Sequence, residues 1–147
     1  MESNTELAYL AGLFDGEGCV SILKVSKQAG FKSFRYRLRI QITNTNKHLM
    51  NWLNERFNFH IATHVPLKKN WKMCWVALKH DRKARNMLVE MLPYLKVKKD
   101  EALLAIEFQK HKDQIGTSNG ASGLTQEQIE YRERLKKELS ALKEQKI

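Results

Sequence analysis

LAGLFDGEGCVSI, residues 10–22, decides the fold of this chain. Small and apolar residues at helical spacing run into two acids, Asp15 and Glu17, and Gly18 then interrupts the helical pattern. Cys19–Ser26 follows directly and has the composition of a strand. The stretch therefore places two carboxylates at a helix-to-strand junction, in a chain that is otherwise strongly basic.

The composition predicts one folded domain with a real core, since 42% of the 147 residues are apolar and none of the apolar runs approaches the ~20 residues of a membrane span. The N-terminus, MESNTE, is acidic, so we expect no secretory signal. An intracellular location follows, either a bacterial or phage cytoplasm or an organelle matrix or stroma. Cys19 and Cys74 form at most one bridge, and we expect free thiols in a reducing compartment.

The positive charge is concentrated in one segment. Residues 18–80 hold 12 lysines and arginines but only one acid, Glu55, and so carry +11 against +10 for the whole chain. A basic surface of this kind favours a polyanion, because each cation near a phosphate releases condensed counterions. The alternative is a basic surface that is merely solvated.

The clearest periodic pattern lies in the predicted strand Phe31–Thr43. Arg35, Arg37, Arg39 and Gln41 alternate with apolar residues, so the polar set shares one face of the sheet and the apolar set enters the core. Three arginines with no acid opposite them would repel one another, which favours an anion at this face over plain solvent. Arginine and glutamine are also the side chains that read guanine and adenine edges in a major groove.

The other predicted elements complete an α+β chain without a tandem repeat. Ser3 and Glu6 cap a first helix over Glu6–Phe14, and a turn at 28–30 joins the first two strands. The rest are a helix over Lys47–Phe57, a hairpin of His60–Val65 and Trp71–Leu78 around a turn at 66–70, a helix over Asp81–Leu92 that Pro93 ends, a helix over Lys99–Lys112, and a final helix capped by Thr125 and Gln128. We expect residues 1–115 to form the main unit, 116–123 (GTSNGASG) a flexible linker, and 124–147 a C-terminal helix of the same domain.

Two further patterns have ordinary explanations. His60 and His64 share a strand face, but they lie too far apart along the strand to bind one zinc ion, and no paired cysteines help. Trp71, Met73 and Trp75 share a face of the second hairpin, where we favour core packing over contacts with thymine methyl groups.

LAGLFDGEG, residues 10–18, resembles the LAGLIDADG motif of homing endonucleases. Phe14, Gly16 and Glu17 depart from that motif, each conservatively for the roles of the motif. The order of helices and hairpins over roughly residues 5–112 resembles the same family. The resemblance implies the αββαββα fold with an antiparallel, saddle-shaped sheet, to which this chain adds C-terminal helices.

Ala8, Ala11 and Gly12 are small residues on the first helix, and such residues let two helix backbones approach closely. Ordinary packing inside one subunit produces the same pattern. The resemblance implies instead that this helix packs against the same helix of a second copy, because the chain holds only one motif. We therefore expect a homodimer with an isologous interface.

Pairing those helices would bring two DGEG ends together, and carboxylates that close repel one another unless cations bridge them. Mg²⁺, with its preference for oxygen ligands, is the expected cofactor. Mn²⁺ is expected to substitute for it, and Ca²⁺ to support binding without cleavage. The resemblance implies that Glu17 is the metal ligand, that the Gly16 carbonyl also ligates, and that Asp15 is a hydrogen-bonding group at the helix end.

The resemblance also covers PYLKVK, residues 93–98. Lys98 matches a family lysine near the scissile phosphate, with Lys96 as the alternate, although both would otherwise be ordinary solvated lysines. Asn44 falls where relatives often carry a glutamine that positions solvent. His48 falls near a position where a basic residue is common, and metal-free chemistry through His48 is the weaker alternative.

The resemblance as a whole implies a site-specific endonuclease that cuts double-stranded DNA at a long pseudo-palindromic target, leaves 3′ overhangs and promotes intron or intein mobility. An intron-RNA maturase, or a nucleic-acid-binding protein of the same fold that does not cleave, is the alternative. The residues expected to contact DNA are Lys24, Lys27, Lys32, Arg35, Arg37, Arg39, Gln41, His48, Lys68, Lys69 and Lys72.

Overall fold

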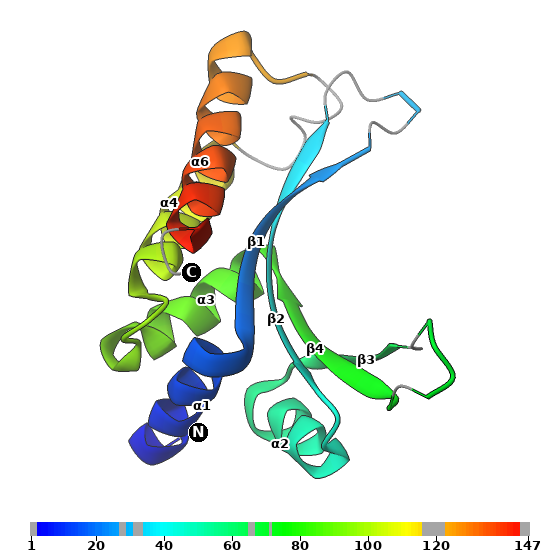
Figure 1. Ribbon diagram of the computed structural model, residues 1–147. Coiled ribbons are helices and arrows are strands. Elements are labelled where there is room, and N and C mark those ends of the chain that lie inside the picture. Colours follow the sequence, from blue (N-terminus) through cyan, green and yellow to red (C-terminus); the bar gives the residue numbers. More distant parts are fainter. Residues whose placement is uncertain are drawn as a thin grey trace.

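The computed structural model describes residues 3–26, 29–30, 34–64, 67–70, 72–115 and 123–144. They form an α+β fold, as predicted (Figure 1). The elements are α1 (Asn4–Glu17), β1 (Gly18–Val25), β2 (Arg35–Asn44), α2 (Lys47–Phe57), β3 (His60–His64), β4 (Cys74–His80), α3 (Asp81–Met91), the 3-10 turn η1 (Leu92–Tyr94), α4 (Lys99–Ile115) and α6 (Gln126–Glu144).

Two predicted capping boxes are present. The Ser3 side chain accepts a hydrogen bond from the Glu6 backbone N–H at 3.1 Å, and the Glu6 carboxylate accepts one from the Ser3 N–H. Thr125 and Gln128 exchange the same pair of bonds before α6, at 2.9 and 3.1 Å. Each box satisfies two backbone donors that a helix start leaves without partners.

The first helix is longer than the sequence pattern predicts. It ends at Glu17 instead of Phe14, so both acids of the motif lie in its last turn. Gly18 then adopts an extended conformation and begins β1. A Cβ at Gly18 would lie 2.2 Å from Cδ1 of Phe14, so this glycine is required by the buried ring that packs against it.

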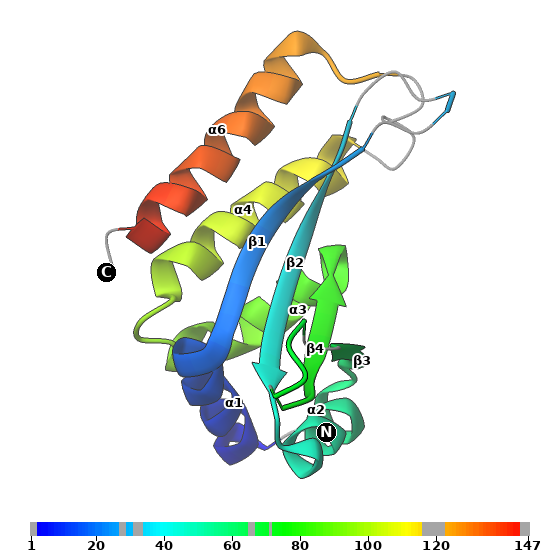
Figure 2. The same cartoon turned by 45° about the vertical axis from the view of Figure 1, so that its right-hand side comes forward.

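The strands form one antiparallel sheet in the order β1-β2-β4-β3, and Figure 2 shows its curvature. The second hairpin is shifted from the prediction, because β4 covers Cys74–His80 where the pattern indicated Trp71–Leu78. The register between β2 and β4 starts at Arg39, which is opposite His80. The first four residues of β2 are therefore not paired with β4.

The predicted alternation in β2 is confirmed. Tyr36, Leu38, Ile40 and Ile42 are all buried and face the helices, whereas the arginines and Gln41 are partly exposed on the other face. Trp75 packs against the core, as favoured. Of the other two residues of that predicted face, Met73 is exposed and Trp71 lies outside the described residues, as do residues 116–122 of the predicted linker.

The helices pack on the apolar face of the sheet (Figures 1 and 2). The last helix, α6, lies against α4 and β1, and it buries Leu135 and Leu139 in the common core. Its Glu133 accepts a hydrogen bond from the Tyr36 hydroxyl at 2.7 Å. Burial and this bond together raise the pKa of Tyr36. Among the helices described, none is both long and apolar enough to cross a bilayer.

Candidate functional site

The end of α1 meets the end of β2 at a pair of polar side chains. Glu17 is exposed, and its Oε2 accepts a hydrogen bond from Nδ2 of Asn44 at 2.7 Å. The other end of the same amide is also held, because the backbone N–H of Asn46 donates to Oδ1 of Asn44 at 2.7 Å. This second bond orients the amide, so that its N–H group points at the Glu17 carboxylate.

Asp15 joins the end of α1 to the segment that precedes α4. Its Oδ2 accepts from the backbone N–H of Lys96 at 2.8 Å, and its Oδ1 accepts from those of Val97 and Lys98 at 3.2 and 3.0 Å. The ammonium of Lys98 donates to the backbone carbonyl of Asp15 at 2.7 Å. A cation at this position is favourable, since the carbonyl end of a helix carries partial negative charge.

The structure thus brings four predicted residues together at one end of α1: Asp15, Glu17, Asn44 and Lys98. Gly16 lies between the two acids and is exposed. His48 is exposed in the first turn of α2, and no hydrogen bond or ion pair in the described part of the chain joins it to this group.

The oxygen donors at this site suit a hard divalent cation, but one chain supplies few of them. Glu17 offers an exposed carboxylate and Gly16 an exposed backbone position, whereas both oxygens of Asp15 are occupied by backbone donors. Within the described ranges, no three His, Cys, Asp or Glu residues are grouped closely enough to hold a metal ion. Mg²⁺ takes six oxygen ligands and usually keeps several waters among them, so Glu17 and the Gly16 carbonyl would supply only some of its ligands.

One side of α1 is exposed on the surface of the protomer. Thr5, Ala8, Tyr9, Gly12 and Gly16 are all exposed, and at 100° per residue they form a single stripe along the helix. A Cβ added at Gly12 or Gly16 would meet nothing within 4 Å. Of the three residues expected at a dimer interface, Ala8 and Gly12 therefore lie on this stripe.

Ala11, the third residue of that set, lies elsewhere. It is 0% exposed and belongs to the core of its own protomer, beside Leu10 and Phe14. A side chain buried in this way cannot reach a second copy. Ala11 therefore packs α1 against the core of its own protomer.

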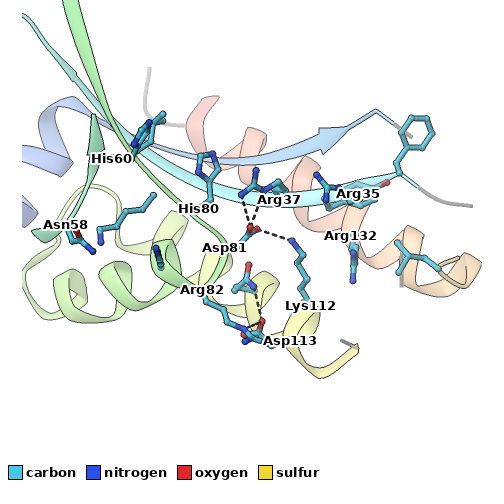
Figure 3. Close-up of a pocket in the computed structure, with 17 residues that line it drawn as sticks. Arg35, Arg37, Asn58, His60, His80, Asp81, Arg82, Lys112, Asp113 and Arg132 are labelled. Carbon is cyan, nitrogen blue, oxygen red and sulfur yellow. Dashed lines mark hydrogen bonds and ion pairs between the residues drawn. The ribbon is translucent and has the colours of Figure 1, made fainter. Parts of the chain in front are cut away.

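An acid at the start of α3, Asp81, pairs with an arginine on the polar face of β2. The sequence pattern did not predict this pair. Nε and Nη2 of Arg37 lie 3.1 and 3.0 Å from Oδ2 of Asp81, and the Lys112 ammonium lies 3.0 Å from Oδ1 (Figure 3). The expectation that no acid faces the three arginines is wrong, because the chain turns directly from β4 into α3 at Asp81. Burial acts to raise the pKa of Asp81, but Lys112 and Arg37 outweigh burial and lower it.

Arg35, Arg39 and Gln41 occupy the same face as Arg37. The Nε atoms of Arg35 and Arg39 are buried without a hydrogen-bond partner in the described structure. His80 is opposite Arg39, and its pKa is lowered by burial and by the charge of Arg37. Only the pairing register of β4 places His80 on this face, so the sequence pattern alone does not indicate it.

Lys24 lies on the other face of the sheet. It is paired with Tyr36 across the strands, and its ammonium lies 2.9 Å from the Glu133 carboxylate of α6. Of the other lysines expected at DNA, Lys27 and Lys32 lie outside the described residues. The lysines between β3 and β4 are exposed, namely Lys68, Lys69 and Lys72.

Comparison with solved structures shows this fold in several DNA complexes. The archaeal intron-encoded homing endonuclease I-Vdi141I in complex with DNA matches with a TM-score of 0.75 and 19% identity, over 96% of this chain and 86% of that one. The homing endonuclease I-CvuI, in complex with its target in the presence of Ca, matches with a TM-score of 0.73 and 16% identity, over 94% and 82%. The meganuclease I-SmaMI bound to uncleavable DNA matches with a TM-score of 0.69 and 17% identity, over 88% of this chain but 43% of its own.

Sequence comparison identifies the family. No curated protein sequence matches the chain. A sequence model of the LAGLIDADG endonucleases matches residues 10–112, which include the motif at the end of α1, the whole sheet and nearly all of α4. Because this match spans well over half of the 147 residues, the chain belongs to the LAGLIDADG endonuclease family.

Proposed function

We propose that this protein is a homing endonuclease that works as a homodimer. It hydrolyses both strands of a long pseudo-palindromic DNA site with Mg²⁺, leaves 3′ overhangs, and promotes the mobility of an intron or intein. One observation carries the proposal: Glu17, Asn44 and Lys98 meet at the end of a helix whose outer stripe is exposed and made largely of small residues.

The space around Gly12 supports the proposed homodimer. A glycine inside a helix costs roughly 0.5–1 kcal/mol relative to alanine. Nothing in the described protomer explains that cost, because a Cβ at Gly12 would meet nothing within 4 Å. A second α1 lying against the stripe explains it, since small residues permit close helix contact. The match to less than half of the I-SmaMI chain supports the same view, because that chain has room for a further unit of this size.

Pairing of the two α1 helices places the two Glu17 carboxylates at one junction. There, Glu17 and the Gly16 carbonyl of each copy would hold Mg²⁺, which suits the oxygen donors present. When bound, the ion neutralises charge on the phosphodiester and lowers the pKa of bound water. I-CvuI, which has the same fold, was solved with its target in the presence of Ca and with the I-CreI target in the presence of Mg, where the DNA is not cleaved; both structures are consistent with a divalent metal at such a site.

The other site residues act around Glu17. The Asn44 amide holds the Glu17 carboxylate in place, since both ends of the amide are engaged. Lys98 keeps an ammonium at the end of α1, where it stabilises negative charge on the phosphate. The Asp15 carboxylate accepts from the backbone N–H groups of Lys96, Val97 and Lys98, and it therefore positions Lys98.

The polar face of the sheet is the proposed DNA surface. Arg35, Arg39 and Gln41 are suited to reading base edges in the major groove, while Arg37 is already paired with Asp81. The exposed lysines between β3 and β4 suit contacts with the phosphate backbone. Lys24 is left out of this surface, because it is paired with α6 on the opposite face.

The proposal is tested by a cleavage selection. Purified protein is incubated with a library of long duplexes and Mg²⁺ or Mn²⁺, and the cut ends are sequenced. We expect paired breaks at a nearly palindromic site for the wild type and for Glu55→Gln, an exposed acid on α2 that serves as the matched control. Glu17→Gln is expected to lose cleavage but to keep Ca²⁺-supported binding.

The same selection tests the alternative function. Tight binding of DNA or RNA without breaks, whichever metal is present, would identify a maturase or another protein that binds without cleaving. Full activity of Glu17→Gln would instead remove Glu17 from the metal site.

A further inference from the structure

A cavity of about 760 Å³ lies at the other end of β2 from Glu17. It opens beside the residues of β2 that are not paired with β4, and the start of α3, the last turns of α4 and the side of α6 enclose it (Figure 3). Arg37 is the lining residue of β2 nearest to the catalytic end, and it lies seven residues from Asn44, roughly 23 Å along the strand. The cavity is therefore distinct from the catalytic end, and it adjoins the polar face of β2, since Arg35 and Arg37 line both.

The cavity is strongly basic. Seven lysines and arginines line it, against two aspartates. Both aspartates already have partners, because Asp81 pairs with Arg37 and Lys112, and Asp113 pairs with Arg82 and with an arginine outside the lining. The excess positive charge therefore has no internal acid to balance it among the described residues that line the cavity.

Arg132 is the most unusual of these side chains. It is 4% exposed, and its Nε has no hydrogen-bond partner. Within the described structure no carboxylate pairs with it. Its guanidinium carbon lies 5.9 Å from the centre of the Tyr36 ring, and it is close enough to Lys112 and His111 to lower the pKa of both. Burial of an unpaired charge is costly, so it persists where a counter-ion of matching shape repays the cost. Burial also lowers the pKa of Arg132.

We propose that this cavity binds a phosphate group, with Arg132 as its main contact and Arg35 as a second. The planar guanidinium matches phosphate oxygens in a bidentate fork, and Arg35 lines the same cavity with its own Nε unpartnered. The cavity volume lies within the range of ligand sites and exceeds that of a single phosphate, so it accommodates a pyrophosphate or a nucleotide.

Two sources could supply this phosphate. One is the backbone of the bound duplex, about seven base pairs from the cleavage point for a duplex that follows the ~23 Å of β2 at ~3.4 Å per pair. That source rests on the proposed function. The other is a free phosphate compound, which does not depend on DNA cleavage.

The first experiment is calorimetric titration of inorganic phosphate and pyrophosphate into the wild type, Arg132→Gln and Arg134→Gln, with EDTA present. Arg134 is the matched control, because it lies two residues away on α6 with its side chain 62% exposed. We expect pyrophosphate affinity to fall roughly ten- to a hundred-fold in Arg132→Gln, the loss of a charged hydrogen-bond pair, and to stay unchanged in Arg134→Gln. If Arg132→Gln does not fold, Arg35→Gln takes its place in this titration only, with the same direction of change, because Arg35 also lies on the proposed DNA surface.

The second experiment separates the two sources. Binding of a non-specific duplex is measured against salt concentration for the same variants. The slope is that of the logarithm of the binding constant against the logarithm of salt concentration. If a backbone phosphate occupies the cavity, Arg132→Gln should reduce the size of this slope by about 1, and Arg134→Gln should leave it unchanged. An unchanged slope with lost pyrophosphate binding identifies a free phosphate compound.

The site is refuted if Arg132→Gln and Arg134→Gln match the wild type in both titrations. Because neither measurement involves metal or cleavage, this result is distinct from failure of the proposed nuclease function. That failure would appear only in the Glu17-dependent cleavage test.

Discussion

Replacing Asp15 with asparagine should weaken the fold by about 2 kcal/mol. The asparagine oxygen can keep the two bonds from Val97 and Lys98, which both reach Oδ1. The amide nitrogen then takes the place of Oδ2 and faces the Lys96 N–H, which now points at another donor. A hydrogen bond to a charged group contributes ~1.5–3 kcal/mol, and partial exposure of this carboxylate puts the loss toward the lower part of that range.

Urea unfolding of Asp15→Asn beside Glu17→Gln measures this difference. Glu17 is exposed and a glutamine oxygen still accepts from Asn44, so its replacement should change the free energy of unfolding by less than ~0.5 kcal/mol. The expected drop for Asp15→Asn corresponds to roughly 4–8 °C in Tm for a domain of this size. Equal stability of the two variants would refute the separation of a structural Asp15 from a chemical Glu17.

Three further predictions follow from the described contacts. Gly12→Leu should keep the monomer fold but prevent dimer formation in analytical ultracentrifugation, whereas Gly18→Ala should destabilise the monomer itself, because a Cβ there lies 2.2 Å from an aromatic ring. Leu139→Ala should cost ~2–5 kcal/mol in urea unfolding, since this α6 side chain is only 3% exposed; a change below 1 kcal/mol would mean that α6 is not part of the core. Burial and neighbouring arginines lower the pKa of both His80 and His111 below 6.5, so the folded state binds fewer protons than the unfolded state just below pH 6.5. The stability that the two neutral histidines contribute should therefore be fully present above that pH, and it should be lost as the pH falls through their lowered pKa values. Replacing both histidines with glutamine should flatten a plot of the urea midpoint against pH.

The sequence was sufficient to predict features that depend on local pattern. Alternation in β2 separates Arg35 from Tyr36, and the spacing of Ser3 and Glu6 predicts the first cap. The same reasoning could have placed Lys24 correctly. Side chains alternate between the two faces of a strand, so Lys24 lies on the same face of β1 as Val20 and Ile22. Both of these are buried, and Lys24 therefore also points toward the helices.

Features that depend on long-range contacts were beyond the sequence pattern. Asp81 was predicted only as a helix start, yet it adopts a positive φ of 51° and its carboxylate joins β2 to α4. Arg132 lies on a helix with many charged residues, and nothing in the sequence pattern distinguishes it from them. Its burial depends on how α6 packs on Tyr36, and no local periodicity contains that information.

The position of α6 also matters for the synthesis of the chain. The hairpin of β1 and β2 is complete at residue 44, but the helix that covers part of its apolar face ends at residue 144. At ~5–20 residues per second, a ribosome needs roughly 5–20 s to make the intervening chain. During that time the nascent protein has an incomplete core, because Leu135 and Leu139 do not yet cover the hairpin. We therefore expect a chain that stops before α6 to be removed by proteolysis instead of persisting as a partly active nuclease.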